Sequence, residues 1–246
     1  MLIRFAVENF LSFKDKQIFS MVAAKHTRHH EHIADIEGKR ILKGSFLFGA
    51  NASGKSNFIK AIGFAKRIIY SGLSGVDRKY FRLDPSCASK PGSFQFDIFS
   101  NGSFYSYGFA FSYVDNTIIS EWLYKVTGTS ELCIFERVFE NGRTEINTDA
   151  KYSEDNRYRF RIYGEDVKRG RTFLQEIAEK EIINSYEFRA FKDVWNWFGN
   201  LVVIFPDMHL GPSALRDLAS DDRFHQLLQS LDTGIKSISI QEQSLD

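Results

Sequence analysis

An eight-residue motif constrains this 246-residue chain more than any other feature. Residues 49–56 read Gly-Ala-Asn-Ala-Ser-Gly-Lys-Ser, which matches the G-x-x-x-x-G-K-[ST] pattern of a phosphate-binding loop. That pattern works between a strand and a helix, and the flanking sequence predicts both. Residues 41–48 end in an apolar, strand-like run, and apolar residues repeat with helical spacing from Phe58 to Ile69. The motif therefore predicts that the chain binds a nucleoside triphosphate.

The residue types of the motif suit a polyanion. Gly49 and Gly54 let the main chain approach phosphate groups closely, and successive amides can form an anion-binding nest. The helix that follows adds the partial positive charge of its N-terminus. We expect ATP with Mg²⁺ as the ligand, with Lys55 as the catalytic cation and the Ser56 hydroxyl on the metal. The predicted nucleotide-binding residues are Ser12 together with Gly49, Ala50, Asn51, Ala52, Ser53, Gly54, Lys55, Ser56 and Asn57.

Composition excludes several classes of protein. Hydrophobic residues make up 43% and charged residues 26%, as in an ordinary globular chain. No apolar run approaches the length of a membrane span, which is about 20 residues. Cys87 and Cys133 have no paired spacing, so we expect reduced thiols and a cytoplasmic location. A net charge of +1 argues against a chain that is basic overall.

The first part of the chain predicts strands at 2–8 and 16–22, a polar loop at 26–40 and a helix at 55–70. Alternating apolar residues then run from Phe94 to Phe139, interrupted by the turn pairs Asn101-Gly102 and Asp115-Asn116 and followed by Asn141-Gly142. This pattern predicts an antiparallel meander.

The last part of the chain is less regular. Arg157, Arg159 and Arg161 alternate with apolar residues and predict a basic strand. Helical spacing follows around residues 173–178, 188–198 and 219–231. Residues 201–205 predict a short buried strand that ends at Pro206, and residues 236–241 predict a weak last strand.

Several segments in order resemble one known group of ATPases. The segments are Arg4-Phe5, Asn9-Phe10-Leu11-Ser12-Phe13, residues 49–57, Glu121-Trp122-Leu123-Tyr124, Phe135-Glu136-Arg137, Ile204-Phe205-Pro206-Asp207 and Asp232-Thr233-Gly234-Ile235. They resemble ABC-type ATPases of the structural-maintenance-of-chromosomes (SMC) and overcoming-lysogenization-defect (OLD) group, and above all the prokaryotic AAA-15/AAA-21 type of ATP-binding protein.

The resemblance implies an α/β fold, namely a P-loop NTPase of ABC-ATPase type with a mixed sheet, an antiparallel β-meander subdomain and a helical segment. Residues 1–92 would form the P-loop region, 93–150 the antiparallel subdomain, and 151–246 the basic strand, helical segment and start of a following lobe. Ser12 would approach the nucleotide. Leu11 stands where the group has a basic residue, and Lys14 is the candidate substitute.

The resemblance also implies function. Such heads self-associate around ATP, and many act in DNA repair or anti-phage defence beside a nuclease or toxin partner. We therefore expect an ATP-binding head that controls an effector or DNA processing, with nucleic acid as a further partner. The alternative is a nucleotide-responsive scaffold or binding module without turnover of its own.

The sequence lacks two parts that ATP hydrolysis needs in this group. No apolar strand ends in Asp-Glu, and no signature motif occurs. We therefore expect an N-terminal portion of a larger head that hydrolyses ATP weakly or not at all by itself. Gln95, Gln175, Gln241 and Gln243 are open candidates for a magnesium contact.

Three further clusters have two interpretations each. His26, His29, His30 and His32 predict either a solvated loop or a metal site. The basic residues at 157–161 with Lys168, Arg169 and Arg171 predict either a solvated face or contacts to nucleic acid. Asp207 is either a helix cap or turn residue, or a carboxylate at a strand end near the nucleotide.

Overall fold

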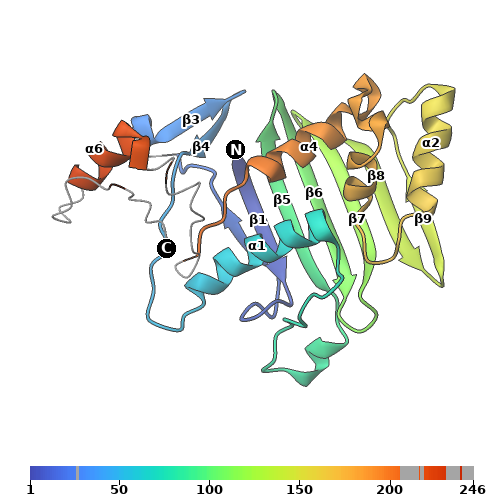
Figure 1. Cartoon of the computed structure of the whole chain (residues 1–246), viewed down its shortest axis with the longest axis horizontal. Coiled ribbons are helices and arrows are strands. Elements are labelled where there is room, and N and C mark those ends of the chain that lie inside the picture. Colours follow the sequence, from blue (N-terminus) through green and yellow to red (C-terminus); the bar gives the residue numbers. More distant parts are fainter. Residues whose placement is uncertain (26–27, 206–215, 217–218, 231–238, 240–246) are drawn as a thin grey trace, which may run out of the picture. The chain divides into compact units, whose positions relative to one another are not determined.

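The computed structural model describes residues 1–25, 28–205, 216, 219–230 and 239. Its internal contacts divide the chain into two compact units, Met1–Val203 and Ile204–Asp246. The first unit contains a seven-stranded sheet and the helices that pack on it (Figure 1). The described residues of the second include helix α6 (Asp222–Ser230), which confirms helix within the predicted segment 219–231.

All neighbouring strands of the large sheet run antiparallel. Their order is β2-β1-β5-β6-β7-β8-β9. From β5 onward each strand pairs with its successor, so the predicted meander is confirmed, as are the two N-terminal strands. The strands are β1 (Leu2–Glu8), β2 (Gln17–Ser20), β5 (Gly92–Ser100), β6 (Ser103–Ser112), β7 (Thr117–Thr127), β8 (Ser130–Glu140) and β9 (Arg143–Asn147).

Two Asn-Gly pairs fix the register of the meander. Asn101 and Gly102 have φ values of 51° and 77°, and Asn141 and Gly142 have φ values of 51° and 79°. Two successive left-handed residues make the tight turn whose twist matches that of the flanking strands. Because both turns admit two residues only, each inward-facing aromatic side chain stays on the core side.

Helices cover one face of the sheet and bury its aromatic side chains. Figure 1 shows α1 (Lys55–Ser71) and α4 (Arg189–Asn200) crossing the strands, with α2 (Glu154–Glu165) beside β9. Helix α3 (Phe173–Ala178) and the short 3-10 helices η3 (Glu181–Asn184) and η4 (Tyr186–Phe188) contribute buried residues to the first unit's larger core. A further 3-10 helix, η2 (Pro85–Ala88), precedes β5. Fully buried rings include Phe5, Phe10, Phe94, Phe96, Phe109, Phe135, Phe173 and Phe191. The predicted α/β class with an antiparallel subdomain and a helical segment is confirmed. A mixed sheet was also predicted, whereas all described strand pairs are antiparallel.

The opposite face of the sheet is largely polar and carries a small hairpin. Strands β3 (Ile33–Ile36) and β4 (Lys39–Leu42) follow η1 (His30–His32), so the prediction of a loop over 26–40 is wrong for this part. The polar composition hid a Glu37-Gly38 turn in which both residues have positive φ. Ile41 of the hairpin packs with Ile3 and Phe104 in a second, smaller core.

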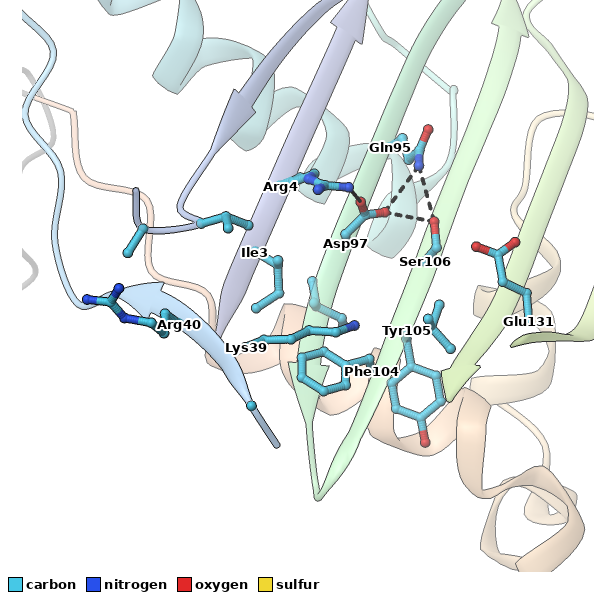
Figure 2. Close-up of a pocket in the computed structure, with 15 residues that line it drawn as sticks. Ile3, Arg4, Lys39, Arg40, Gln95, Asp97, Phe104, Tyr105, Ser106 and Glu131 are labelled. Atoms are coloured by element: carbon cyan, nitrogen blue, oxygen red, sulfur yellow. Dashed lines mark hydrogen bonds and ion pairs between the residues drawn. The ribbon is translucent and has the colours of Figure 1, made fainter. Parts of the chain in front are cut away.

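A pocket of about 590 Å³ opens beside this hairpin (Figure 2). Arg4, Gln95, Asp97 and Ser106 line it, and Asp97 accepts hydrogen bonds from the Gln95 amide and the Ser106 hydroxyl at 3.1 and 2.8 Å. These residues alternate along β1, β5 and β6 with the core residues that face α1. The pocket therefore lies on the sheet face away from α1.

Two predicted strands are wrong. Strand β4 ends at Leu42, and residues 44–50 have no regular structure; Phe46 and Phe48 are 84% and 89% exposed. Residues 201–205 are likewise irregular, with Val202 75% exposed. A short apolar segment becomes a strand only where a neighbour completes its ladder of hydrogen bonds, and no described strand pairs with either segment.

The predicted basic strand at 157–161 is a helix instead, since these residues lie within α2. Glu154 and Asp155 occupy its first turn, where negative charge stabilises a helix. Phe160 is buried, and Gly164 lets the helix approach β9, because a Cβ there would lie 2.4 Å from the Ile146 side chain. An accidental alternation of Arg with apolar residues imitated the period of a strand.

A buried carboxylate joins the sheet to the helical layer. The side chain of Glu121 on β7 accepts hydrogen bonds from the Tyr107 hydroxyl at 3.0 Å and from Arg137 Nη2 at 3.1 Å. It also accepts from the backbone amides of Phe173 and Leu174, at 2.5 and 3.0 Å, at the start of α3. Burial, with the Glu121 charge, raises the pKa of Tyr107 well above its usual value, so this hydroxyl stays a donor.

We expect Glu121→Ala to lower the free energy of unfolding by about 3–5 kcal/mol, because Arg137 is left buried without its counter-charge. The exposed Glu140 of β8 is a matched control, and Glu140→Ala should change stability by less than about 0.5 kcal/mol. Urea unfolding followed by circular dichroism measures both. Equal stability of the two variants would contradict this role.

Candidate functional site

The phosphate-binding motif forms an exposed loop at the N-terminus of α1. Gly54 precedes the helix with a φ of 93°, and Ala52 has a φ of 63°. Glycine is required at position 54, because an added Cβ would lie 2.9 Å from the Ser12 hydroxyl oxygen. Helix starts leave their first amides without intrahelical partners, so this end of α1 presents donors to an anion.

The Lys55 ammonium bends back over the loop. Its Nζ donates to the carbonyl oxygens of Gly49 and Ala50, both at 2.7 Å, and lies 3.5 Å from the Ser53 hydroxyl. The loop backbone therefore holds the cation where a phosphate group would meet it. The Ser56 hydroxyl is exposed in the first turn of α1, and Asn51 and Ala52 are exposed in the same loop.

Ser12 lies against the loop, as the resemblance implies. Its hydroxyl accepts a hydrogen bond at 3.1 Å from the Asn57 side-chain amide, in the first turn of α1. Ser12 belongs to a tight turn after β1, closed by two backbone hydrogen bonds between Phe10 and Phe13 at 2.9 and 2.8 Å. Two segments more than forty residues apart thus meet at the N-terminus of α1.

Asn9 positions that turn, and sequence reasoning did not assign it a role. It is 2% exposed and has a φ of 46°. Its amide nitrogen donates to the carbonyl oxygens of Cys87 and Lys90, both at 2.9 Å, and its side-chain oxygen accepts from the Phe81 amide at 3.0 Å. The Asn-Phe-Leu-Ser-Phe segment was the one signal in the sequence that could have found it.

A pocket of about 720 Å³ adjoins the contact between Ser12 and Asn57. Leu11, Ser12 and Asn57 form one side of it and residues 77–83 form the other. The second side carries the cations of Arg78, Lys79 and Arg82 and the rings of Tyr80 and Phe81, opposed by one carboxylate, Asp77. Sequence analysis predicted no function for this segment.

Lys14 does not take the place of the missing basic residue in this structure. Its ammonium lies 2.9 Å from the Asp84 carboxylate. The hydrogen bond from Lys14 holds the pKa of Asp84 well below its usual value, with further hydrogen bonds from Ser86. Lys14 is thereby directed toward the 84–86 segment.

Neither described glutamine candidate reaches Ser56. Gln95 bonds to Asp97 and Ser106 on the sheet face away from α1. Gln175 donates to the Tyr70 carbonyl oxygen at 2.8 Å, near the C-terminal end of α1. That end is about 20 Å from Ser56 along the helix. Gln241, Gln243 and Asp207 lie outside the described residues.

The basic cluster is partly neutralised. Arg161 pairs with Glu165 at 2.8 Å, and Arg171 pairs with Glu176 at 3.3 Å and with Glu179. Arg169 lies over the Phe139 ring. These contacts favour the interpretation of a solvated, ion-paired face.

The two cysteines are buried and not bonded to each other. Burial, with nearby Glu136 and Asp149, raises the pKa of the Cys133 thiol to about 11. A thiol with such a pKa is a poor nucleophile.

A search of the described helices finds none that is long and apolar enough to cross a membrane.

Comparison with known families gives one match. Residues 45–160 match the AAA_21 family, described as "AAA domain, putative AbiEii toxin, Type IV TA system". The matched segment contains the phosphate-binding loop, α1 and strands β5–β9, and it confirms the resemblance to AAA-21 ATP-binding proteins. The SMC/OLD grouping stays a prediction. No curated protein matches the chain significantly.

We expect Asn9→Ala to destabilise the chain by about 2–3 kcal/mol, because it removes a buried amide and leaves backbone groups without partners. Asn196 is exposed on α4, so Asn196→Ala is the matched control and should be almost neutral. Chemical denaturation gives both values. A neutral Asn9→Ala would show that the turn does not depend on this side chain.

Proposed function

We propose that this chain binds ATP with Mg²⁺ through the loop at 49–56. The observation that carries the proposal is the Lys55 ammonium held over the loop at the N-terminus of a 17-residue helix. Backbone donors, a helix N-terminus and a lysine together fit a triphosphate. The Ser56 hydroxyl would hold the metal, which neutralises phosphate charge when bound.

The pocket beside Ser12 and Asn57 suits the nucleoside end of the ligand. It adjoins the first turn of α1, so a ligand whose phosphates lie on the loop can extend into it. A purine ring stacks on aromatic or guanidinium planes, and residues 80–82 supply both. The surplus of positive charge also suits a ligand that carries four negative charges.

At the level of the whole protein, we propose an ATP-binding head of SMC/OLD type. ATP-dependent self-association of such heads would control a nuclease or toxin effector or DNA processing, in anti-phage defence. The family description of the matched segment, which names a toxin of a type IV toxin–antitoxin system, supports an effector of this kind. A scaffold that binds nucleotide without turnover remains the second candidate, because Asn9, Ser12 and the loop are arranged for binding whether or not hydrolysis follows.

Lys55→Ala should weaken ATP·Mg²⁺ binding about 10- to 100-fold, since it removes hydrogen bonds from a cation to phosphate worth about 1.5–3 kcal/mol. Lys60 is exposed one turn further along α1, so Lys60→Ala is the control and should bind like the unchanged chain. Isothermal titration calorimetry measures the affinities. Absence of heat with the folded, unchanged chain would refute the proposal.

Arg82→Ala tests the pocket separately from the loop. If Arg82 contacts the nucleoside, the variant should bind ATP about tenfold more weakly and bind inorganic tripolyphosphate unchanged. Lys55→Ala should weaken the binding of both ligands, because both carry the phosphate groups. Equal losses for ATP and tripolyphosphate in Arg82→Ala would place Arg82 on the phosphates and contradict this use of the pocket.

A further inference from the structure

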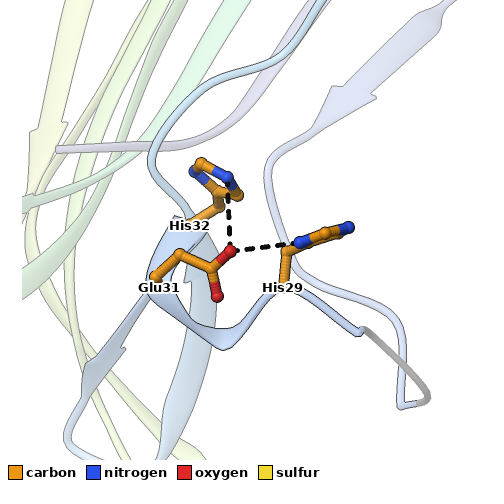
Figure 3. Close-up of side chains that lie close together, drawn as sticks. All are labelled: His29, Glu31 and His32. Carbon is orange, nitrogen blue, oxygen red and sulfur yellow. Dashed lines mark hydrogen bonds and ion pairs between the residues drawn. The ribbon is translucent and has the colours of Figure 1, made fainter.

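Three polar side chains converge where η1 leads into the β3–β4 hairpin. His29, Glu31 and His32 each direct one metal-ligating atom to the same point, and these atoms lie within 4.8 Å of one another. In Figure 3 one carboxylate oxygen of Glu31 lies between the two imidazole rings. His30, in the same turn, does not join the group, and His26 lies outside the described residues.

The distances fit a tetrahedral ion. His29 Nδ1 lies 3.1 Å from Glu31 Oε1, and His32 Nε2 lies 3.6 Å from the same oxygen. With bonds of about 2.0–2.1 Å, neighbouring ligands of a tetrahedral zinc ion are about 3.3 Å apart. Both distances to the shared oxygen are close to this spacing, and all three ligand atoms lie within 4.8 Å of one another.

Hydrogen bonds within the turn and from Lys43 hold the backbone beneath the three side chains. The His32 amide donates to the His29 carbonyl oxygen at 3.1 Å, which closes the turn. Lys43 then donates twice, from Nζ to the Glu31 carbonyl oxygen at 2.9 Å and from its amide to the His32 carbonyl oxygen at 2.8 Å. Lys43 directly follows β4, and the fully buried Ile41 anchors that strand. Such support reduces the entropy that a ligand must overcome.

The chemistry of the three groups selects the ion. Two imidazole nitrogens and one carboxylate oxygen suit zinc and its neighbours, whereas Mg²⁺ and Ca²⁺ prefer oxygen alone. A plain ion pair at the surface would need only one histidine. A second imidazole beside the same carboxylate oxygen would add little stability to such a pair.

We propose that His29, Glu31 and His32 form a binding site for a divalent transition-metal ion of the zinc class, with a fourth position open to water. The site is separate from any magnesium on the loop at 49–56, both in its ligands and in its place in the chain. A bound ion would hold the turn that leads into β3, because its three ligands all lie between residues 29 and 32.

The test uses the chain without a histidine tag. Titration calorimetry with Zn²⁺ should give one ion per chain, and Co²⁺ should give the intense visible bands of four-coordinate geometry. His29→Gln and His32→Gln should each weaken Zn²⁺ binding at least about tenfold, as loss of a ligand or its support does. These side chains are exposed, so the variants should keep the circular dichroism spectrum of the unchanged chain.

His30→Gln is the matched control, because His30 is exposed in the same turn and lies outside the cluster. It should bind Zn²⁺ within about twofold of the unchanged chain. Three outcomes would overturn the site: no stoichiometric Zn²⁺ binding, weak six-coordinate Co²⁺ bands, or an equal loss of affinity in His30→Gln and His29→Gln. Adding Zn²⁺ should also slow hydrogen exchange in the turn at 29–32 of the unchanged chain and should not do so in His29→Gln. Equal exchange in both would count against the proposal.

Discussion

The hydrogen bonds of one buried carboxylate hold the two layers of the first unit together. Glu121 binds Tyr107 and Arg137 within the sheet and two backbone amides at the start of α3. Helix α3 in turn holds the far end of α1, through Gln175 and the Tyr70 carbonyl oxygen. The near end of α1 is held by the contact between Asn57 and Ser12. The helix that carries the candidate phosphate site is therefore fixed at both of its ends by polar groups, while its apolar face packs on the sheet.

Regular segments were predictable because their signals are local. Asn-Gly pairs and strict alternation define the meander, and helical spacing defines α1 and α4 without knowledge of their neighbours. Two predicted strands failed because no described strand lies beside them. Residues 44–48 and 201–205 are apolar enough for strands, yet a strand exists only beside another, and sequence alone does not supply that neighbour.

The candidate site divides in the same way. The loop and Ser12 were found from the motif and the resemblance, because glycines and a lysine at fixed spacing have a mechanism. Asn9 and residues 77–83 were not, since their roles depend on contacts between positions more than seventy residues apart. Lys14 shows the converse: its charge made it a candidate, and its pairing with Asp84 directs it elsewhere. Proximity in the fold, not residue type, decides such cases.

The internal hydrogen bonds of Lys55 have a consequence for energetics. A ligand that engages this ammonium must first displace two carbonyl oxygens that already satisfy it. Association is therefore an exchange of partners, and only the difference between the two sets of bonds contributes to affinity. The same hydrogen bonds hold the shape of the loop without a ligand, so binding would cost little conformational entropy of its backbone. A ligand that meets the loop would therefore find this ammonium already in place.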